Sequence, residues 1–308
     1  MSSGAGVSRP HVSVIAAAFN AARTLPALFD SIEAADQAAG VAWEAVLVDN
    51  ASTDATPELL RDFAARSKVP VTVLREARQG LSAARNAGLR AARGRLLAIT
   101  DSDCVIAPDY VASIVREFAA DPELGLLGGR VELYNPADLP VSIRTSRVRT
   151  PVTTDALNFS DVPGCNTVFT RALIDEIGPY DVRLGFGTRC GPSEDIDLTY
   201  RAARSGRRVI YTPDVVVYHN HGRSTEAQLR ATQESYAVGK GVFFAKYALR
   251  LHRPILKAAY WEIAALAKEL RRPSPADESS LGAGAILTAM MRGAWLALTD
   301  EMLKPFAR

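Results

Sequence analysis

The sequence predicts an α/β fold in which a mostly parallel sheet is flanked by helices, with a helical extension at the C-terminus. Apolar runs of strand length alternate with helical patterns between residues 11 and 119. Polar clusters follow the apolar runs, where ligands bind at the carboxyl ends of parallel strands. From about residue 225 onward, strand patterns stop and long helical patterns follow. Alternating strands and helices favour a parallel sheet covered on both faces.

The first elements follow in order along the chain. Strands are predicted at residues 11–16, 43–48, 71–74 and 96–100, and helices at residues 24–37, 56–67, 81–92 and 108–119. Thr24 and Thr56 stand at helix starts, where a hydroxyl can cap the first turn, and Pro57 occupies the first helical position. The pattern indicates four strand–helix units.

The later elements are spaced more widely. Ser193 is predicted to open a helix, and residues 215–218 form a strand. Residues 134–161 and the glycine-rich residues 185–192 are predicted to be loops near a binding site. Further helices are predicted at residues 225–250, 254–271 and 283–303.

Composition limits the function classes. The 308 residues are 48% hydrophobic and 23% charged, which suits one large core or a main domain with a helical annex. The net charge of +2 gives no reason to expect a nucleic-acid partner. Cys104, Cys165 and Cys190 lack C-x-x-C spacing, so a disulfide framework or zinc site is not expected and a reducing cytoplasm fits best. The first ten residues lack an apolar run, so we expect a disordered tail and no secretion signal.

Two carboxylates, Asp101 and Asp103, follow the apolar run of residues 96–100. At the end of a strand they reach the edge of the sheet, where a hard divalent cation can bridge them to a diphosphate. The chain lacks the P-loop and the G-x-G-x-x-G motif after a strand, so those nucleotide-binding classes lose their main support. Gly239 and Gly241, which flank Lys240 in a helical region, are interpreted as incidental.

Several motifs in a fixed order carry a family resemblance. Residues 12–20, 46–54 and 80–88, then the acidic pair, and later residues 164–166, 193–198 and 219–221, resemble the family 2 glycosyltransferases of the GT-A fold, a Rossmann-like architecture. The resemblance covers residues 12–224. It implies a catalytic domain at residues 11–224, with a nucleotide-binding half at 11–104, an acceptor-binding half at 105–224 and a C-terminal helical region at 225–308.

The resemblance implies a nucleotide site in the first half. Asp49 matches the residue that binds the nucleobase, and Asp101 would lie near the ribose or the metal. The family often has proline where this chain has Ala17. The implied nucleotide-binding residues are Ala17, Phe19, Asn20, Asp49, Gly80, Arg85 and Asp101.

The resemblance also implies a metal ion. Asp103 would bind Mn²⁺ or Mg²⁺ directly, with Asp101 nearby and one of His219 and His221 as a further ligand. Imidazole tilts the preference toward Mn²⁺. The cation would neutralise the charge on the departing nucleoside diphosphate.

The resemblance places the general base at the start of the helix after Ser193. Asp195 is expected to be the base and Glu194 its close neighbour, and the helix dipole is expected to keep Asp195 ionised at neutral pH. Gly164 and Asn166 would line the donor sugar and acceptor floor. Asp197 would bind either the acceptor or a basic side chain.

The C-terminal region carries a basic cluster beside aromatic residues. Lys246, Arg250, His252, Arg253 and Lys257 lie close in sequence to Phe243, Phe244, Tyr247 and Trp261. Such a face suits peripheral docking on the inner side of a membrane, while packing against the catalytic domain is the alternative.

These features together predict a metal-dependent, inverting glycosyltransferase of the hexosyltransferase type. The donor would be a nucleotide-diphospho-sugar, preferably a UDP-sugar, and the acceptor a glycan, a lipid-linked sugar or a small molecule. A sugar nucleotidyltransferase and an inactive nucleotide-sugar-binding scaffold are the alternatives. The oligomeric state is left open.

Overall fold

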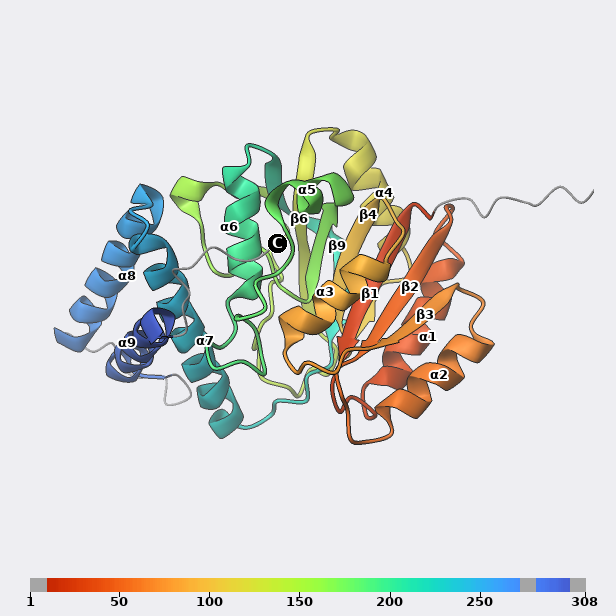
Figure 1. Ribbon diagram of the computed structural model, residues 1–308, viewed down its shortest axis with the longest axis horizontal. Helices are drawn as coiled ribbons and strands as arrows, with labels where there is room; N and C mark the ends of the chain where they lie inside the picture. Colours follow the sequence, from red (N-terminus) through yellow and green to blue (C-terminus); the bar gives the residue numbers. More distant parts are fainter. Residues whose placement is uncertain (1–9, 272–280, 300–308) are drawn as a thin grey trace, which may run out of the picture.

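The computed structural model describes residues 10–271 and 281–299, and its described part is built on one nine-stranded mixed sheet (Figure 1). The strands are β1 (Val12–Ala18), β2 (Trp43–Asp49), β3 (Val71–Arg75), β4 (Leu96–Asp101), β5 (Cys104–Ile106), β6 (Leu124–Leu133), β7 (Thr150–Pro151), β8 (Asn166–Thr170) and β9 (Arg208–His219). The strand order is β3-β2-β1-β4-β8-β6-β9-β5, with β7 paired to β9. The predicted tail, apart from Pro10, lies outside the described residues.

The register of the parallel strands brings their carboxyl ends together. β1 pairs in parallel with β2 and β4, so that Ala18 lies opposite Asp49 and Ala17 lies opposite Asp101. β8 then joins β4 and β6 in antiparallel fashion, which carries the sheet into the second half of the chain. The two halves therefore share one sheet, and the polar ends of β2 and β4 meet at one edge.

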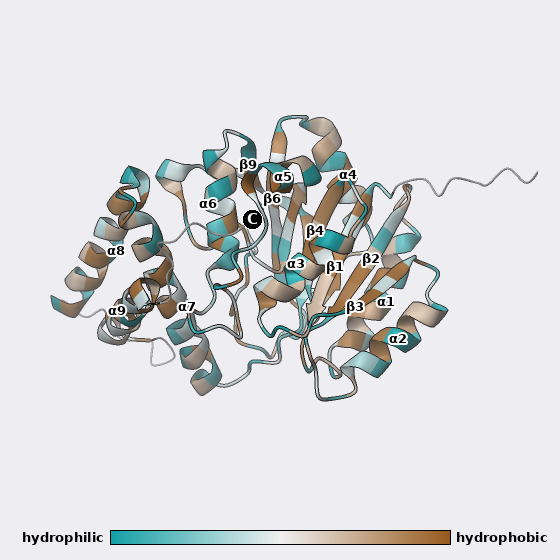
Figure 2. Cartoon of the chain, viewed as in Figure 1, coloured by the Kyte–Doolittle hydropathy of each residue, from teal (hydrophilic) through white to brown (hydrophobic). Residues whose placement is uncertain are grey.

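Helices cover both faces of the sheet. They are α1 (Leu25–Asp36), α2 (Thr56–Arg66), α3 (Leu81–Ala91), α4 (Tyr110–Ala120), α5 (Arg171–Ile177), α6 (Glu194–Arg204), α7 (Glu226–Ala248), α8 (Arg253–Arg271) and α9 (Ala283–Thr299). Apolar residues alternate along β1: Val12, Val14 and Ala16 pack with α1, α2 and α4, whereas Ile15 packs with α3, α5 and α6. The inner strands accordingly show as apolar in Figure 2.

The predicted α/β class and the first eight elements are confirmed, with ends that shift by two residues or fewer. Thr24 is the N-cap residue of α1, as predicted, although its hydroxyl donates to the Ala21 carbonyl and makes no cap bond. The predicted Thr56 cap is wrong, because α2 begins at Thr56, whose N–H donates to Asp54 Oδ1 at 3.0 Å. The Ser193 hydroxyl precedes α6 but makes no cap bond.

The C-terminal helices form a layer beside α6. Ile196 and Tyr200 of α6 share an apolar cluster with α7, α8 and α9. Gly239 and Gly241 are not incidental, because a Cβ at these positions would lie 1.8 Å from the Pro192 carbonyl oxygen and 2.0 Å from the Met290 carbonyl oxygen. The last residues of the predicted helix 283–303, from residue 300 on, lie outside the described part.

Among the helices that the structure describes, none combines the length and apolar character that crossing a bilayer requires.

Candidate active site

A cavity of about 880 Å³ opens at the carboxyl edge of the sheet. Its volume suits a ligand of nucleotide size. Loops after β1 and β4, the start of α3, the start of α6, the end of β9 and one face of α7 supply its wall. Asp101, Asp103 and His219 line this cavity together with Glu194 and Asp195. The acidic pair and the α6 carboxylates, which lie about ninety residues apart in the chain, therefore face one space.

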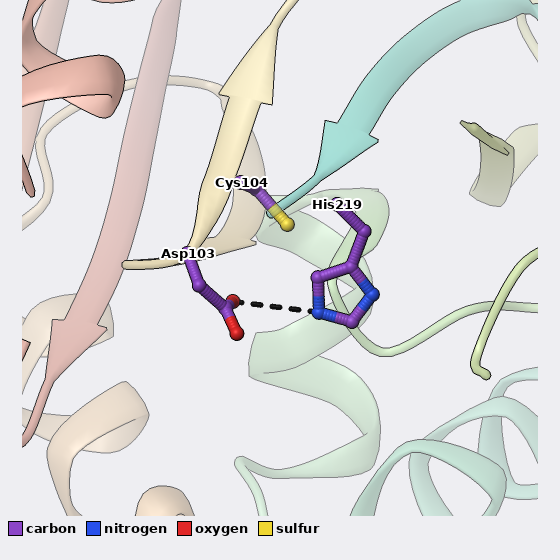
Figure 3. A group of neighbouring side chains, drawn as sticks. All are labelled: Asp103, Cys104 and His219. Atoms are coloured by element: carbon purple, nitrogen blue, oxygen red, sulfur yellow. Dashed lines mark ion pairs between the residues drawn. The ribbon is translucent and has the colours of Figure 1, made fainter. Parts of the chain in front are cut away.

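Asp103, Cys104 and His219 form a compact group with metal-ligand chemistry (Figure 3). Antiparallel pairing of β5 with β9 places Cys104 opposite His219. His219 Nε2 lies 3.4 Å from Asp103 Oδ1, and one potential ligand atom from each of the three residues lies within 4.8 Å of the others. The strand pairing thus builds the cluster from residues far apart in sequence.

The protonation of this cluster follows from its burial and contacts. Burial alone would lower the pKa of His219, but the hydrogen bond to Asp103 raises it to about 9. Burial would raise the pKa of Asp103, yet the same hydrogen bond lowers it. A hydrogen bond with Cys165 and burial raise the pKa of Cys104 well above its ordinary value. Cys104 therefore stays a thiol, and the remaining candidate ligands are the Asp103 carboxylate and the His219 imidazole, which would have to release its proton to bind a cation.

The second histidine faces elsewhere. His221 Nδ1 accepts from the Arg223 N–H at 2.9 Å and lies 3.7 Å from Asp138 Oδ2. It does not line the cavity. Of the two histidines that the sequence left open, His219 is the one placed beside Asp103.

Arg85 joins the two acidic regions. Its fully buried guanidinium donates to Asp101 Oδ1 at 2.8 Å, to Glu194 Oε1 at 2.9 Å and to the Gly164 carbonyl at 3.1 Å. Gly88 on the same helix permits this placement, because a Cβ there would lie 2.4 Å from Ile15 Cγ2. Arg85 thereby holds the start of α6 against the end of β4.

Glu194 and Asp195 have different surroundings. Glu194 is buried, with one oxygen on Arg85 and the other accepting from the Ser193 N–H at 3.1 Å. Asp195 Oδ1 accepts from the Ile196 N–H at 2.7 Å. Its Oδ2 has no hydrogen-bond donor among the described residues. Gly164 lies close to this oxygen, since a Cβ added to the glycine would be only 3.0 Å from it. Asp195 is therefore the carboxylate that can accept a proton from a ligand.

The expectation that Asp195 stays ionised at neutral pH is wrong. Burial and the adjacent Glu194 carboxylate raise the pKa of Asp195 to about 7. The Ile196 N–H and Arg85 lower it, but they offset only part of the rise. Desolvation thus outweighs the helix dipole that the sequence argument relied on.

Comparison with known families agrees with this geometry. The model of "Glycosyl transferase family 2" matches residues 13–178, and that of "Glycosyl transferase family group 2" matches residues 96–297. The chain belongs to the family 2 glycosyltransferases.

Similar proteins fit this assignment. Glycosyltransferase AglE of Haloferax volcanii is 25% identical over 233 residues, which cover 75% of this chain and 73% of AglE. The succinoglycan biosynthesis protein ExoO of Rhizobium meliloti is 29% identical over 247 residues, covering 78% and 70% of the two chains.

Solved structures confirm the GT-A fold. The mannosyltransferase PcManGT of Pyrobaculum calidifontis, solved with GDP-Man and Mn²⁺, has a TM-score of 0.64 and 25% identity, with 96% of this chain and 89% of that chain covered. S. aureus TarS 1–349 with UDP-GlcNAc has a TM-score of 0.54 and 21% identity, with 75% and 66% covered.

The residues predicted to hold the nucleotide in this glycosyltransferase are mostly brought together. Ala17, Phe19, Asn20 and Gly80 line the cavity with Arg85 and Asp101. Asp49 does not: its Oδ1 accepts from the Ser52 N–H at 3.0 Å, and its neighbour Asn50 lines the cavity instead. The Asn50 side chain is itself occupied, because it binds the Glu76 and Arg78 carbonyls and the Gly80 N–H.

Asn166 does not line the cavity, in contrast to the prediction that it would line the donor sugar and acceptor floor. Its side chain is fully buried and donates to the carbonyls of Arg130 and Val215, at 2.9 and 3.0 Å. It also accepts from the Tyr110 hydroxyl at 3.1 Å. The Asn166 side chain therefore links β6, β8 and β9. Gly164, the other residue predicted for this part of the site, lines the cavity.

Asp197 binds basic side chains and not the acceptor. Oδ1 accepts from Lys246 Nζ at 2.5 Å, and Oδ2 accepts from Arg201 Nε at 2.9 Å. Burial alone would raise the pKa of Asp197, but Lys246 and Arg201 lower it to about 2. Lys246 also donates to Asp181 and is buried, which removes it from any exposed basic face.

Lys246→Met is expected to lower the free energy of unfolding by about 3 kcal/mol, because Asp181 and Asp197 lose the buried cation between them and keep, among the described cations, only the partly exposed Arg183 and Arg201. Denaturant unfolding measures the loss. Lys257→Met, at an exposed position, is the matched control and should change it by less than about 0.5 kcal/mol. Equal stability of the two variants would contradict the buried ion cluster.

The sequence missed several residues of this glycosyltransferase's cavity wall. Arg23 and Arg223 line it as cations with no ion pair to another described residue. Arg223 follows the His219 motif closely, which is a signal that could have found it. Phe159 and Phe186 line the cavity from loops. Tyr236 and Lys240 line it from α7, where their four-residue spacing puts them on one face of the helix.

Proposed function

We propose that this glycosyltransferase moves a sugar from a nucleotide-diphospho-sugar to an acceptor hydroxyl with inversion of configuration. The observation that carries the proposal is the shared cavity: Asp103, His219 and Asp195 line the same space. A leaving diphosphate and an attacking hydroxyl need this arrangement.

The residues present fit a Mn²⁺ or Mg²⁺ ion. Asp103 and His219 would hold it, since Asp103 Oδ1 and His219 Nε2 face each other at 3.4 Å and both residues line the cavity. When bound, the cation would supply charge neutralisation for the departing diphosphate. Asp101 is proposed only as an outer contact, because its Oδ1 already accepts from Arg85.

The donor is proposed to lie along the edge of the sheet. Phe19 is 52% exposed and offers a ring face to the base, while Arg23 and Arg223 supply positive charge to the diphosphate. The structures of PcManGT with GDP-Man and of TarS with UDP-GlcNAc support the donor class. We favour a UDP-sugar as the donor.

Asp195 is proposed as the general base. The acceptor oxygen attacks the anomeric carbon as the bond from that carbon to the diphosphate oxygen breaks, and the hydroxyl proton passes to Asp195 Oδ2. A single displacement inverts the anomeric carbon. Glu194 is proposed to act beside it by holding Arg85 and by raising the pKa of Asp195.

Turnover is expected to rise with pH and to level off above a pKa of about 7, because only the deprotonated form of Asp195 accepts the acceptor proton. Below that value the rate should fall about tenfold per pH unit. A pH profile of kcat measures this. In Glu194→Gln the inflection should move to lower pH, because a neighbouring negative charge is lost; a flat profile in the unchanged enzyme would contradict the assignment.

The acceptor is proposed to enter between the loops and α7. Phe159, Phe186 and Tyr236 offer aromatic faces there, which suit a sugar ring.

We propose residues 11–104 as the donor half, 105–224 as the acceptor half and 225–308 as a helical region. The acceptor stays a glycan, a lipid-linked sugar or a small molecule. Cys104 and Cys165 are buried free thiols, which supports a cytoplasmic location.

Donor hydrolysis tests the proposed function. UDP-sugars and GDP-sugars are incubated with the enzyme and Mn²⁺, and the released nucleoside diphosphate is measured. Release from one donor, with an inverted anomer of the sugar observed by NMR, is the expected result. Binding of nucleotide without any release would identify an inactive binding protein instead.

A further inference from the structure

An apolar stripe that stays exposed among the described residues runs along α8. Leu256, Tyr260, Ile263 and Leu270 recur at helical spacing on one face, and all are exposed, with Tyr260 at 65% and Ile263 at 49%. The neighbouring Trp261 is 61% exposed and its ring contacts Tyr260. Large apolar side chains gathered on one exposed face mark an interaction surface.

A basic flank borders this stripe. Arg253, Lys257, Lys268 and Arg271 are exposed on the adjacent side of the helix, and none forms an ion pair with another described residue. The other side of α8 packs inward through Ile255 and Leu266. The helix is thus apolar at its outer face and positively charged along one edge, although the whole chain carries a net charge of only +2.

The face expected from the sequence differs from this one. Phe243, Phe244 and Tyr247 are buried in the core of the helical region, and Lys246 is buried against Asp181 and Asp197. The exposed apolar and basic side chains lie on α8, the helix after α7. We propose that the α8 stripe and its basic flank dock the protein peripherally on an anionic membrane surface.

Charge complementarity favours a membrane over a second copy of the chain. In a symmetric dimer with antiparallel α8 helices on this face, the two basic flanks would lie on the same side and would repel each other. Anionic headgroups attract the same flank, and Tyr260 and Trp261 have the amphipathic rings that settle at the boundary between headgroups and acyl chains. An amphipathic helix of this kind lies in the plane of the surface.

The position of α8 links this surface to the cavity. Glu262, on its inner side, pairs with Lys240 Nζ at 2.7 Å, and Lys240 lines the cavity. α8 stands at the opposite end of the molecule from α2 and the β3 edge (Figure 1). If the proposed function holds, docking through α8 would hold the cavity close to the membrane and favour a lipid-linked acceptor.

Vesicle co-sedimentation of the full chain tests the proposal. Vesicles of phosphatidylglycerol with phosphatidylcholine are compared with vesicles of phosphatidylcholine alone, without donor or metal. Binding to the anionic vesicles is expected to fall about tenfold or more in Lys257→Glu/Lys268→Glu, since each basic residue near the surface contributes about 1 kcal/mol. Tyr260→Ser/Ile263→Ser should weaken it similarly by removing apolar contact.

Matched controls lie outside α8, and the charge-reversal control lies near α2, at the opposite end of the molecule from α8. Arg66→Glu/Lys68→Glu makes the same change in net charge near α2, and Val148→Ser removes another exposed apolar side chain; both should bind as the unchanged protein does. Thermal unfolding checks that every variant folds, and donor hydrolysis should be unchanged in the α8 variants, which separates this proposal from the catalytic one.

Three results would overturn the proposal. The first is no binding of the unchanged chain to anionic vesicles, and the second is equal binding by the α8 variants. The third is a dimer in light scattering that Tyr260→Ser/Ile263→Ser converts to monomer, because that would show a second copy covering the stripe.

Discussion

Asp195→Asn is expected to lower kcat by about two to four orders of magnitude, the usual scale of general-base catalysis. The amide has nearly the shape of the carboxylate, but it cannot accept the acceptor proton. Asp195 is the α6 carboxylate with an oxygen open to the cavity, whereas both oxygens of Glu194 are occupied. The affinity for nucleoside diphosphate should be largely retained, because the donor contacts lie on other elements.

Asp175→Asn is the matched control for this substitution. Asp175 is an exposed carboxylate on α5 and does not line the cavity. Its loss should leave kcat unchanged. If Asp195→Asn and Asp175→Asn turned over donor and acceptor equally fast, Asp195 would have no role as base.

Asp103→Asn is expected to lower kcat by at least about two orders of magnitude and to weaken Mn²⁺ binding. The substitution replaces an anionic oxygen donor by a neutral one at the residue beside His219. Rates measured across a Mn²⁺ titration separate the two effects, because a weakened metal site raises the Mn²⁺ concentration at half-maximal rate.

Cys104→Ala provides the control within the same cluster. Its thiol lies with Asp103 and His219 but stays protonated, so its removal should leave the Mn²⁺ dependence close to that of the unchanged enzyme. A loss of Mn²⁺ binding as large as that of Asp103→Asn would show that the sulfur is a ligand.

Much of the first half could be predicted from sequence, because its information is local. Alternating apolar runs define β1 to β4, and the acidic pair at the end of β4 sits at the sheet edge where parallel topology requires it. Motif order then led to the family. These features depend on periodicity and on strand ends, which one sequence displays.

The second half was harder because long-range pairing decides it. Whether Asn166 faces a ligand or the core depends on the strands β6 and β9, whose carbonyls it binds. The partner of Asp197 is Lys246, about fifty residues later. The choice of His219 over His221 follows from the pairing of β5 with β9. Spacing along the chain carries none of these relations.

The protonation of Asp195 was mispredicted for a related reason. The helix start is visible in sequence and favours an ionised carboxylate. The burial of the site and the contact with Glu194, which raise its pKa, appear only when α6, α3 and the loop of Gly164 are assembled.

The most direct test of the account is calorimetric binding of a nucleoside diphosphate, chosen as the product of the preferred donor, with Mn²⁺ and with a chelator. We predict that Mn²⁺ strengthens binding in the unchanged enzyme and in Asp195→Asn, but not in Asp103→Asn. The same Mn²⁺-dependent gain in Asp103→Asn would contradict the claim that this carboxylate holds the cation beside the diphosphate.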